Sequence, residues 1–451
     1  MSLFSIILAA GEGKRMKSKN AKPLQTAGGK ALVDHVLSAV TAAGSEKNIV
    51  VIGHMADNMK AHLGDSVEYA YQYEQLGTGH AVMQGIEALK DAQGTVMVVC
   101  GDTPLITSDT LRGAYDEHIE LGNSATVITA ICDNPFGYGR IIRENGAVTK
   151  IVEQKDATDE EKKICEINSG MYLFDIQKLI SALSRLTNNN AQGEYYLTDV
   201  LEILLKDGCK IGAYVTEFEE TLGVNDRIQL AEADRLLNKR NVERLMRDGV
   251  RILNPESVRV DADVTVGCDT VLYPGTILEG NTKIGEDCII GPNTRICNCT
   301  VGDNTEIQSS VALNSEIGSG TAVGPFAYIR PNSKIGNNIK VGDFVEVKNA
   351  TIGNGTKIAH LTYVGDADVG ERVNFGCGTV IVNYDGVHKN RTTIEDDCFI
   401  GCNTNLVSPV TVRKGAYTAA GSTITDEVPE DSLAIARARQ VNKTGWQRPK
   451  K

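Results

Sequence analysis

The chain has 451 residues, of which 41% are hydrophobic and 23% charged, and its formal net charge is −12 at pH 7. This length predicts two or three domains, and the acidic balance argues against general nucleic-acid binding. No window reaches the roughly 20 apolar residues of a membrane span. The eleven cysteines are an odd number at irregular spacing, so we expect a reduced cytoplasmic protein rather than a disulfide framework.

A strand-like apolar run at residues 4–8 leads directly into a glycine turn and a basic segment. The segment from Gly13 to Val33 contains no acid and six cations, namely Lys14, Arg15, Lys17, Lys19, Lys22 and Lys30. A tight turn after a buried strand offers backbone N–H groups to an anion, and flanking lysines neutralise its charge. The pattern favours a nucleoside triphosphate cradle. The alternative is an ordinary strand–turn–helix with a solvated basic face.

Residues 1 to about 222 alternate strand-like and helix-like segments. Strands are expected at 49–52, 96–100 and 125–131, and helices at 32–43 and 80–89. The alternation predicts a doubly wound, Rossmann-like α/β sheet. A single long helical pattern at 226–250 then predicts a connector.

After this helix, apolar residues recur at every sixth position, usually followed by glycine. They are Val266, Leu272, Leu278, Ile284, Ile290 and Ile296, then Val301, Ile307 and Leu313, then Ile317 to Val347, Ile352 to Val364, Val369 to Ile381, and Ile394 to Val412. Such a period fits neither a helix nor an alternating strand and predicts a parallel β-helix of hexapeptides. We therefore expect three parts: a nucleotidyltransferase domain at 1–225, a linker helix at 226–250, and a β-helix with a tail at 251–451.

Several further motifs accompany the glycine turn. They are Gln72 with the turn 74–81, Gly101-Asp102, the run 137–140, Val152-Glu153, the run 166–170, the run 188–196 and Gly223-Val224-Asn225. With the run 8–16 and Lys22-Pro23, they resemble the sugar-1-phosphate nucleotidyltransferases. Over essentially its whole length, the chain resembles the family of bifunctional bacterial N-acetylglucosamine-1-phosphate uridyltransferase/glucosamine-1-phosphate acetyltransferases. The resemblance implies a left-handed β-helix, a homotrimer, and small-molecule substrates, with a product that feeds peptidoglycan and lipopolysaccharide synthesis.

In the first reaction of such enzymes, a sugar-1-phosphate oxygen attacks the α-phosphorus of UTP, and catalysis depends on positioning and charge neutralisation. Asp102 follows an apolar strand, where open α/β sheets bind ligands, and a carboxylate there suits Mg²⁺. The resemblance implies Asn225 as a second Mg²⁺ ligand, and Arg15 and Lys22 as the cations that act on phosphate. The remaining residues it implies for UTP and the sugar are Leu8, Ala9, Ala10, Gly11, Gln72, Gly77, Thr78, Gly101, Gly139, Glu153 and Asn168. Taken singly, these have plainer explanations as turn formers or surface acids.

In the coil, two cations occupy a position that normally holds glycine. Arg330 follows Ile329 and Lys348 follows Val347, one full turn apart and about 5 Å between rungs. Such cations repel unless an anion lies near them, so a sugar phosphate is expected there; the alternative is a pair of solvated corner cations.

Equivalent counting places four residues in one column, each two positions after an inward residue: His360, Cys377, Cys402 and Ala420. Acetylation of an amine needs a proton acceptor, and histidine suits that role near neutral pH. The resemblance implies His360 as this base and Arg330, Lys348, Tyr363 and Asn374 as ligands of glucosamine-1-phosphate. It assigns acetyl-CoA to Cys377, Asn383, Tyr384, Cys402, Ala420 and Arg437. The family usually has alanine and serine at the positions of Cys377 and Cys402, which leaves the positioning of the acetyl group open.

The repeat is interrupted between Ile381 and Ile394, and an excursion of this length is generally functional. The tail after Ser432 holds only basic charges, including Arg437, Lys450 and Lys451; it suits CoA phosphates or a neighbouring subunit, or it is a frayed end. Two alternatives stay open for the whole chain: a single-activity nucleotidyltransferase with a structural coil, and a non-catalytic scaffold.

Overall fold

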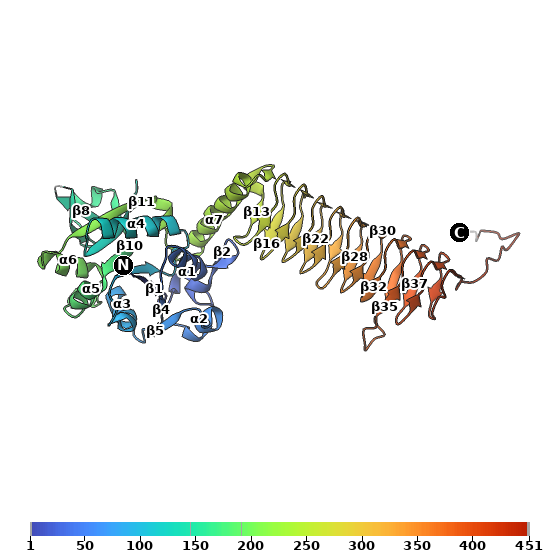
Figure 1. Ribbon diagram of the computed structural model, residues 1–451, viewed down its shortest axis with the longest axis horizontal. Helices are drawn as coiled ribbons and strands as arrows, with labels where there is room; N and C mark the ends of the chain where they lie inside the picture. The colour runs from blue at the N-terminus through green and yellow to red at the C-terminus, as the bar shows by residue number, and fades with distance from the viewer. Residues whose placement is uncertain (1, 145, 191, 449–451) are drawn as a thin grey trace. The chain divides into compact units, whose positions relative to one another are not determined.

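The computed structural model describes residues 2–144, 146–190 and 192–448, and the chain divides into two compact units, Met1–Leu237 and Asn238–Lys451 (Figure 1). The division falls within helix α7 (Arg227–Arg247). The assignment of one activity to each predicted part stays a prediction. Lys450 and Lys451 of the basic tail lie outside the described residues.

The first unit is built on a mixed sheet with the strand order β11-β7-β10-β6-β1-β4-β5. Its strands are β1 (Leu3–Leu8), β4 (Asn48–Ile52), β5 (Glu68–Tyr71), β6 (Thr95–Cys100), β7 (Ala125–Ile131), β10 (Glu166–Asp175) and β11 (Ile211–Thr216). Strands β8 (Arg140–Glu144) and β9 (Ala147–Val152) form a hairpin attached to β10, and β2 (Thr26–Ala27) pairs with β3 (Lys30–Ala31). Because β10 runs antiparallel to both β6 and β7, the expected doubly wound sheet is mixed rather than wholly parallel.

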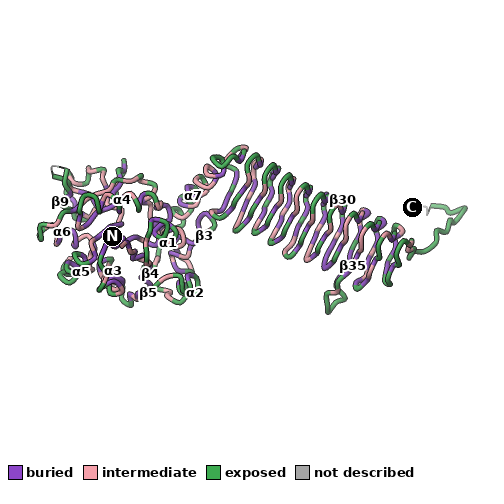
Figure 2. Tube along the Cα trace, in the orientation of Figure 1, coloured by how far each residue is buried: buried purple, intermediate pink, exposed green. Residues whose placement is uncertain are grey.

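Helices cover both faces of this sheet. They are α1 (Leu32–Ala42), α2 (Ala56–Leu63), α3 (Thr78–Ile86), α4 (Ser108–Glu120), α5 (Ile176–Leu183) and α6 (Thr198–Lys206). One core joins Val36 of α1, Met59 of α2 and Leu111 of α4 to one face of the strands, and another joins residues of α3, α5 and α6 to the opposite face. Most residues of the inner strands β1, β4, β6 and β7 are buried (purple in Figure 2). Strands covered on both sides explain the nearly continuous apolar runs in the sequence.

The winding of the sheet reverses between β1 and β6. From β1 the chain proceeds outward to β4 and β5, and then returns to place β6 on the other side of β1. Ligands of open α/β sheets bind at the carboxyl ends of strands at such a reversal. Gly11 follows β1 and Asp102 follows β6, so both predicted motifs lie at this position.

The second unit is a parallel β-helix of three sheets with 11, 10 and 9 strands. The first sheet contains β12 (Arg251–Ile252), β15 (Val271–Leu272), β18 (Ile289–Ile290), β21 (Glu306–Ile307), β24 (Ala322–Val323), β27 (Lys340–Asp343), β30 (Lys357–His360), β33 (Asn374–Phe375), β36 (Phe399–Ile400), β39 (Tyr417–Thr418) and β41 (Leu433–Ala434). The second contains β13 (Arg259–Val260), β16 (Ile277–Glu279), β19 (Arg295–Cys297), β22 (Val311–Leu313), β25 (Tyr328–Ile329), β28 (Glu346–Lys348), β31 (Tyr363–Gly365), β34 (Val380–Val382), β37 (Asn405–Val407) and β40 (Thr423–Ile424). The third contains β14 (Thr265–Val266), β17 (Lys283–Ile284), β20 (Thr300–Val301), β23 (Glu316–Ile317), β26 (Lys334–Ile335), β29 (Thr351–Ile352), β32 (Ala367–Val369), β35 (Thr392–Ile394) and β38 (Thr411–Val412).

The interior of the coil contains the apolar residues of the hexapeptide pattern. The prediction that Leu313 points inward is wrong. Ala312 is fully buried and pairs with Ile296, while Leu313 is only half-buried. The preceding inward residue is Ile307, so this step is five residues long rather than six.

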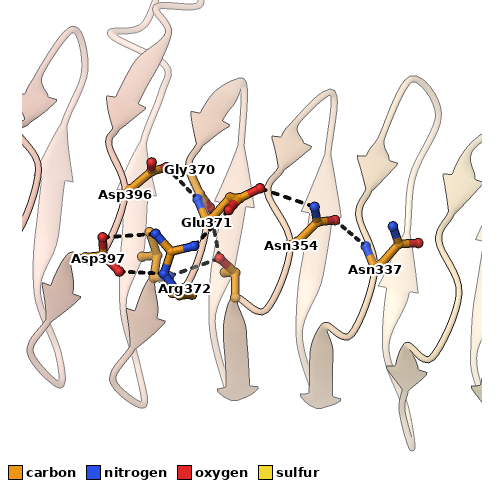
Figure 3. Close-up of polar contacts among 9 residues, drawn as sticks. Asn337, Asn354, Gly370, Glu371, Arg372, Asp396 and Asp397 are labelled. Atoms are coloured by element: carbon orange, nitrogen blue, oxygen red, sulfur yellow. Dashed lines mark hydrogen bonds and ion pairs between the residues drawn. The ribbon is translucent and has the colours of Figure 1, made fainter.

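At one corner of the coil, polar side chains bond from rung to rung (Figure 3). The Asn337 N–H donates to Asn354 Oδ1 (2.8 Å), and Asn354 Nδ2 donates to Glu371 Oε1 (3.2 Å). The Glu371 N–H donates to Asp396 Oδ1 (2.8 Å). Two of these bonds satisfy backbone N–H donors at the turn between two sheets, and the third joins two side chains.

Candidate active sites

Three segments of the first unit bring a lysine, a carboxylate and an amide together. Lys22, on the short 3₁₀ helix Lys22–Leu24, donates from Nζ to Asp102 Oδ2 and to Asn225 Oδ1, the latter at 3.2 Å. The Lys22 and Asp102 side chains are only 15% and 18% exposed. Two oxygens of different chain segments therefore converge on one cation.

This donor set fits Mg²⁺, which prefers oxygen ligands and keeps several of its waters. Within the described ranges, no cluster of three or more His, Cys, Asp or Glu side chains could hold a metal. Asp102 and Asn225 would accordingly supply two ligands, with phosphate oxygens and water as the rest.

The glycine turn after β1 leaves its backbone donors free. The N–H groups of Gly11, Glu12 and Gly13 make no backbone hydrogen bond in the part of the chain that the structure describes. Donors that the protein does not satisfy are available to an anion. Arg15 lies exposed on the 3₁₀ helix Lys14–Met16, and the structure gives it no ion-pair partner among the described residues.

A cavity of about 300 Å³ adjoins this turn. Of the predicted residues, it is lined by Leu8, Ala9, Ala10, Gly11, Lys22, Gln72, Gly77, Thr78 and Asp102. Gln72 Nε2 donates to the Gly77 carbonyl at 3.0 Å. Gly77 has φ = 103°, and a Cβ there would lie 2.6 Å from the Tyr195 carbonyl oxygen, so only glycine fits this wall.

A second cavity of about 590 Å³ shares Leu8, Thr78, Cys100 and Glu194 with the first, and Glu153 and Asn168 line it. The Asn168 N–H donates to the Gly139 carbonyl at 2.9 Å. The predicted sugar residues thus lie together, beside the predicted nucleotide residues. Burial, followed by the charges of Asp156 and Asp199, raises the pKa of Glu153.

Sequence reasoning missed Cys100, which lines both cavities. Burial and then Asp102 raise the pKa of its thiol to about 12, so it is a neutral wall residue. Its position as the last residue of β6, two residues before Asp102, was a signal available in the sequence.

In the coil, the predicted column is present. The inward residues Ile358, Phe375, Ile400 and Thr418 pair in register on successive rungs, and each column member lies two positions further on. The rung below adds Asp343, which pairs with His360. His360 Nδ1 lies 2.7 Å from Asp343 Oδ1.

The His360–Asp343 contact fixes the tautomer of the histidine. The hydrogen bond from His360 lowers the pKa of Asp343, and an ionised carboxylate only accepts. Nδ1 of a neutral His360 therefore carries the proton, and Nε2 is left as an acceptor. Asp343 was missed, although it stands two residues after Val341, in the position already counted for His360.

Arg330 and Lys348 lie on adjacent rungs, as expected, but each has a carboxylate partner. Arg330 Nη1 is 2.7 Å from Glu346 Oε1, and Lys348 Nζ is 3.2 Å from Asp366 Oδ2. Glu346 and Asp366 therefore neutralise these two cations, which do not by themselves require a ligand anion.

A third cation from the excursion changes this balance. The pKa of Lys389 is lowered mainly by its contact with Lys348 and by the charge of Lys348. Lys389 thus adds a third positive charge to this corner, beside the two carboxylates that pair with Arg330 and Lys348. The additional charge of Lys389 favours an anion at this corner.

The other predicted residues of this site are partly assembled. Asn383 donates to Asp366 and, at 3.4 Å, to Tyr363 Oη, which places it beside Lys348. Tyr384 is exposed and donates to the Gly386 carbonyl within the excursion. Asn374 lies on β33 of the first sheet, which pairs with β30, the strand that ends at His360. Arg437 reaches the wall beside Ala420, with its Cδ 3.8 Å from where a Cβ of Gly421 would lie.

Comparison with known proteins finds matches to segments of both units. The family model described as Nucleotidyl transferase matches residues 4–223, and the model for bacterial transferase hexapeptides matches 263–298 and 314–349. A "Bifunctional protein GlmU" from Acetivibrio thermocellus is 57% identical over 446 residues, and one from a Geobacillus species is 55% identical over 445. Each alignment covers 98% of this chain and 97% of the relative. The chain belongs to the bifunctional GlmU family.

Membership of the GlmU family confirms the predicted fold class and the pairing of a nucleotidyltransferase unit with a hexapeptide coil. The roles of the individual residues stay predictions. Beyond the expected set, the structure adds Asp343, Glu346, Asp366 and Lys389 to the coil site.

Proposed function

We propose that this GlmU family member makes UDP-N-acetylglucosamine in two steps. Acetyl-CoA acetylates glucosamine-1-phosphate in the coil, and UTP then reacts with N-acetylglucosamine-1-phosphate in the first unit, releasing pyrophosphate. The observation that carries the proposal is that one chain, alignable with bifunctional relatives over 98% of its length, holds both the Lys22–Asp102–Asn225 cluster and the His360–Asp343 pair.

In the uridylyl step, the protein acts by placement. The free amides after β1 and the Lys22 ammonium hold the triphosphate, while Glu153, Asn168 and Gly139 hold the sugar so that its phosphate oxygen faces the α-phosphorus. Mg²⁺, when bound at Asp102 and Asn225, supplies charge neutralisation for the phosphates.

In the acetyl step, the three cations at the corner hold the sugar phosphate. The amino group attacks the thioester carbonyl, and His360 Nε2 accepts the amine proton as the new bond forms. Asp343 holds the ring in the tautomer that this requires. CoA leaves as a thiolate and takes up the proton. Cys377, Cys402, Ala420 and Arg437 line the path of acetyl-CoA.

An exposed apolar column supports a homotrimer. Phe326, Phe344 and Leu361 occupy one corner with φ values of 61°, 55° and 43°, and they are 57–60% exposed. Left-handed backbone costs a bulky residue about 1–2 kcal/mol, and a neighbouring subunit that buried these side chains would offset that cost. Because Leu361 follows His360 directly, the acetyl site would lie at the subunit seam. Phe344→Asp should lower the mass measured by light scattering from trimer to monomer.

A cytoplasmic location is part of the proposal, since all eleven cysteines are free thiols. Across the described part of the chain, no helix has the length and apolarity needed to cross a membrane.

The test is a pair of assays on the purified chain. We expect CoA release with acetyl-CoA and glucosamine-1-phosphate, and Mg²⁺-dependent pyrophosphate release with UTP and N-acetylglucosamine-1-phosphate. Pyrophosphate release without acetyl transfer would favour the alternative of a single-activity enzyme with a structural coil. Absence of both activities would favour the alternative of a non-catalytic scaffold.

A further inference from the structure

We propose that Cys377 and Cys402 are a peroxide-reactive pair that closes into a disulfide and blocks the acetyl-CoA groove. Both thiols belong to the column above His360. The formation of the disulfide rests on the coil geometry alone, whereas its effect on acetyl transfer rests on the proposed function.

The two cysteines lie on adjacent rungs in the same position. Phe375 pairs with Ile400, and each cysteine is two residues further on. The Asn403 N–H donates to the Cys377 carbonyl at 2.8 Å, which holds the two rungs together at this point. Adjacent strands are about 4.8 Å apart, and disulfides join Cα atoms that are about 4.4–6.8 Å apart.

Parallel rungs also set the direction of the two side chains. In-register Cα–Cβ bonds keep the Cβ atoms about 4.8 Å apart, slightly beyond the usual range of roughly 3.5–4.5 Å. The bridge therefore requires a small approach of the two corners. A disulfide formed this way is readily reduced, which makes the modification reversible.

No other pair among the eleven cysteines lies in the same position on adjacent rungs of the coil. In the first unit, Cys132 and Cys165 are neighbours just beyond the paired ends of the antiparallel strands β7 and β10, where the Cys132 N–H donates to the Cys165 carbonyl at 2.9 Å. Cys288 and Cys398 are buried, and their Sγ atoms donate to backbone carbonyls. Cys268 is exposed and also follows an inward coil residue by two positions, but Glu286 is the residue beside it on the next rung. Cys377 and Cys402 are half-buried and exposed, respectively, so peroxide can reach them.

The chemistry balances with hydrogen peroxide as the oxidant. The Cys402 thiolate attacks peroxide, forming a sulfenic acid as the O–O bond breaks and hydroxide leaves. The Cys377 thiolate then attacks the sulfenic sulfur, the S–S bond forms, and a second hydroxide leaves. Overall, two thiols are oxidised and one peroxide is reduced to two waters. A thiol reductant reverses the change by exchange.

The closed bridge would occupy the groove wall directly above the base. Cys377 is one rung above His360 and Cys402 is one rung below Ala420. A disulfide between them draws the two rungs together and replaces two free thiols with a fixed bridge where the thioester must pass. The nucleotide site is in the other unit and has no part in this change.

The test treats the full chain with hydrogen peroxide and follows three quantities. Peptide mapping by mass spectrometry without reduction should find a Cys377–Cys402 cross-link. Acetyl transfer should fall at least tenfold, while uridylyl transfer changes less than twofold. Dithiothreitol should restore acetyl transfer, and acetyl-CoA present during oxidation should slow its loss.

Two variants sharpen the test. Cys377→Ala should abolish the cross-link and prevent reversible inactivation, whatever its own basal rate. Cys268→Ser is the matched control and should oxidise like the unmodified chain. The proposal is overturned if the cross-link is absent while acetyl transfer is lost, or if Cys377→Ala is inactivated with the same reversibility. A cross-link in a chain that never transfers acetyl groups would instead overturn the proposed function.

Discussion

Replacing Gly77 by alanine should damage the nucleotide site and destabilise the first unit. Gly77 has φ = 103° and ψ = 175°, a region that costs a residue with a side chain about 1–3 kcal/mol. The new Cβ would also displace the Tyr195 carbonyl, which accepts the Gly79 N–H at 2.8 Å. Weakening that bond adds about 1 kcal/mol, for a total of about 2–4 kcal/mol.

For a unit of this size, each kcal/mol of lost stability lowers the melting temperature by about 2–4 °C. Calorimetry should therefore show the melting temperature of the first unit lowered by roughly 5–15 °C. The KM for UTP should rise at least tenfold, while acetyl transfer stays within twofold. Gly208→Ala is the matched control, because Gly208 has φ = 74° and its added Cβ would meet no atom within 4 Å. It should cost about 1–2 kcal/mol with no change in the KM for UTP. Equal melting shifts in both variants, with unaltered UTP kinetics, would refute the role given to Gly77.

Three further results are expected. Asp343→Asn should lower the kcat of acetyl transfer about tenfold or more with less effect on KM, because an amide, unlike a carboxylate, can also donate to Nδ1 and so stabilise the wrong tautomer of His360; a kcat within twofold of the original would contradict this. Asp366→Asn should raise the KM for glucosamine-1-phosphate several-fold, because Asp366 holds Lys348 and Asn383 in place, and an unchanged KM would count against the corner as the phosphate site. Burial lowers the pKa of His118 to about 4 from an ordinary value near 6.5. The folded chain therefore keeps His118 neutral. The contribution of His118 to the free energy of unfolding is complete above pH 6.5, and it falls by up to about 3 kcal/mol as the pH is lowered toward 4. Urea unfolding at pH 7 and pH 5 should show this loss, and His118→Gln should reduce it.

The hexapeptide period allowed the coil to be predicted in detail. Because each rung repeats the last, counting from Ile358 placed His360, Cys377 and Cys402 in one column, and the strand register agrees. The same counting would have found Asp343. It failed at Leu313, where the step between inward residues is five.

Contacts made by irregular segments could not be counted in this way. Lys389 meets Lys348 only through the excursion, and no spacing in the sequence indicates that contact. Asp366, by contrast, is 18 residues after Lys348, and counting one turn would have placed it on the next rung. The antiparallel direction of β10 was likewise not predictable. An apolar run does not indicate whether its strand will pair parallel or antiparallel, because the pairing depends on the whole sheet.

The most direct test of the account uses two variants, each measured in both assays. Asp102→Ala should abolish Mg²⁺-dependent pyrophosphate release and leave acetyl transfer within twofold. His360→Ala should abolish acetyl transfer and leave pyrophosphate release intact. A variant that removed both activities while remaining folded, or one that left its own reaction untouched, would contradict two separate active sites in this chain.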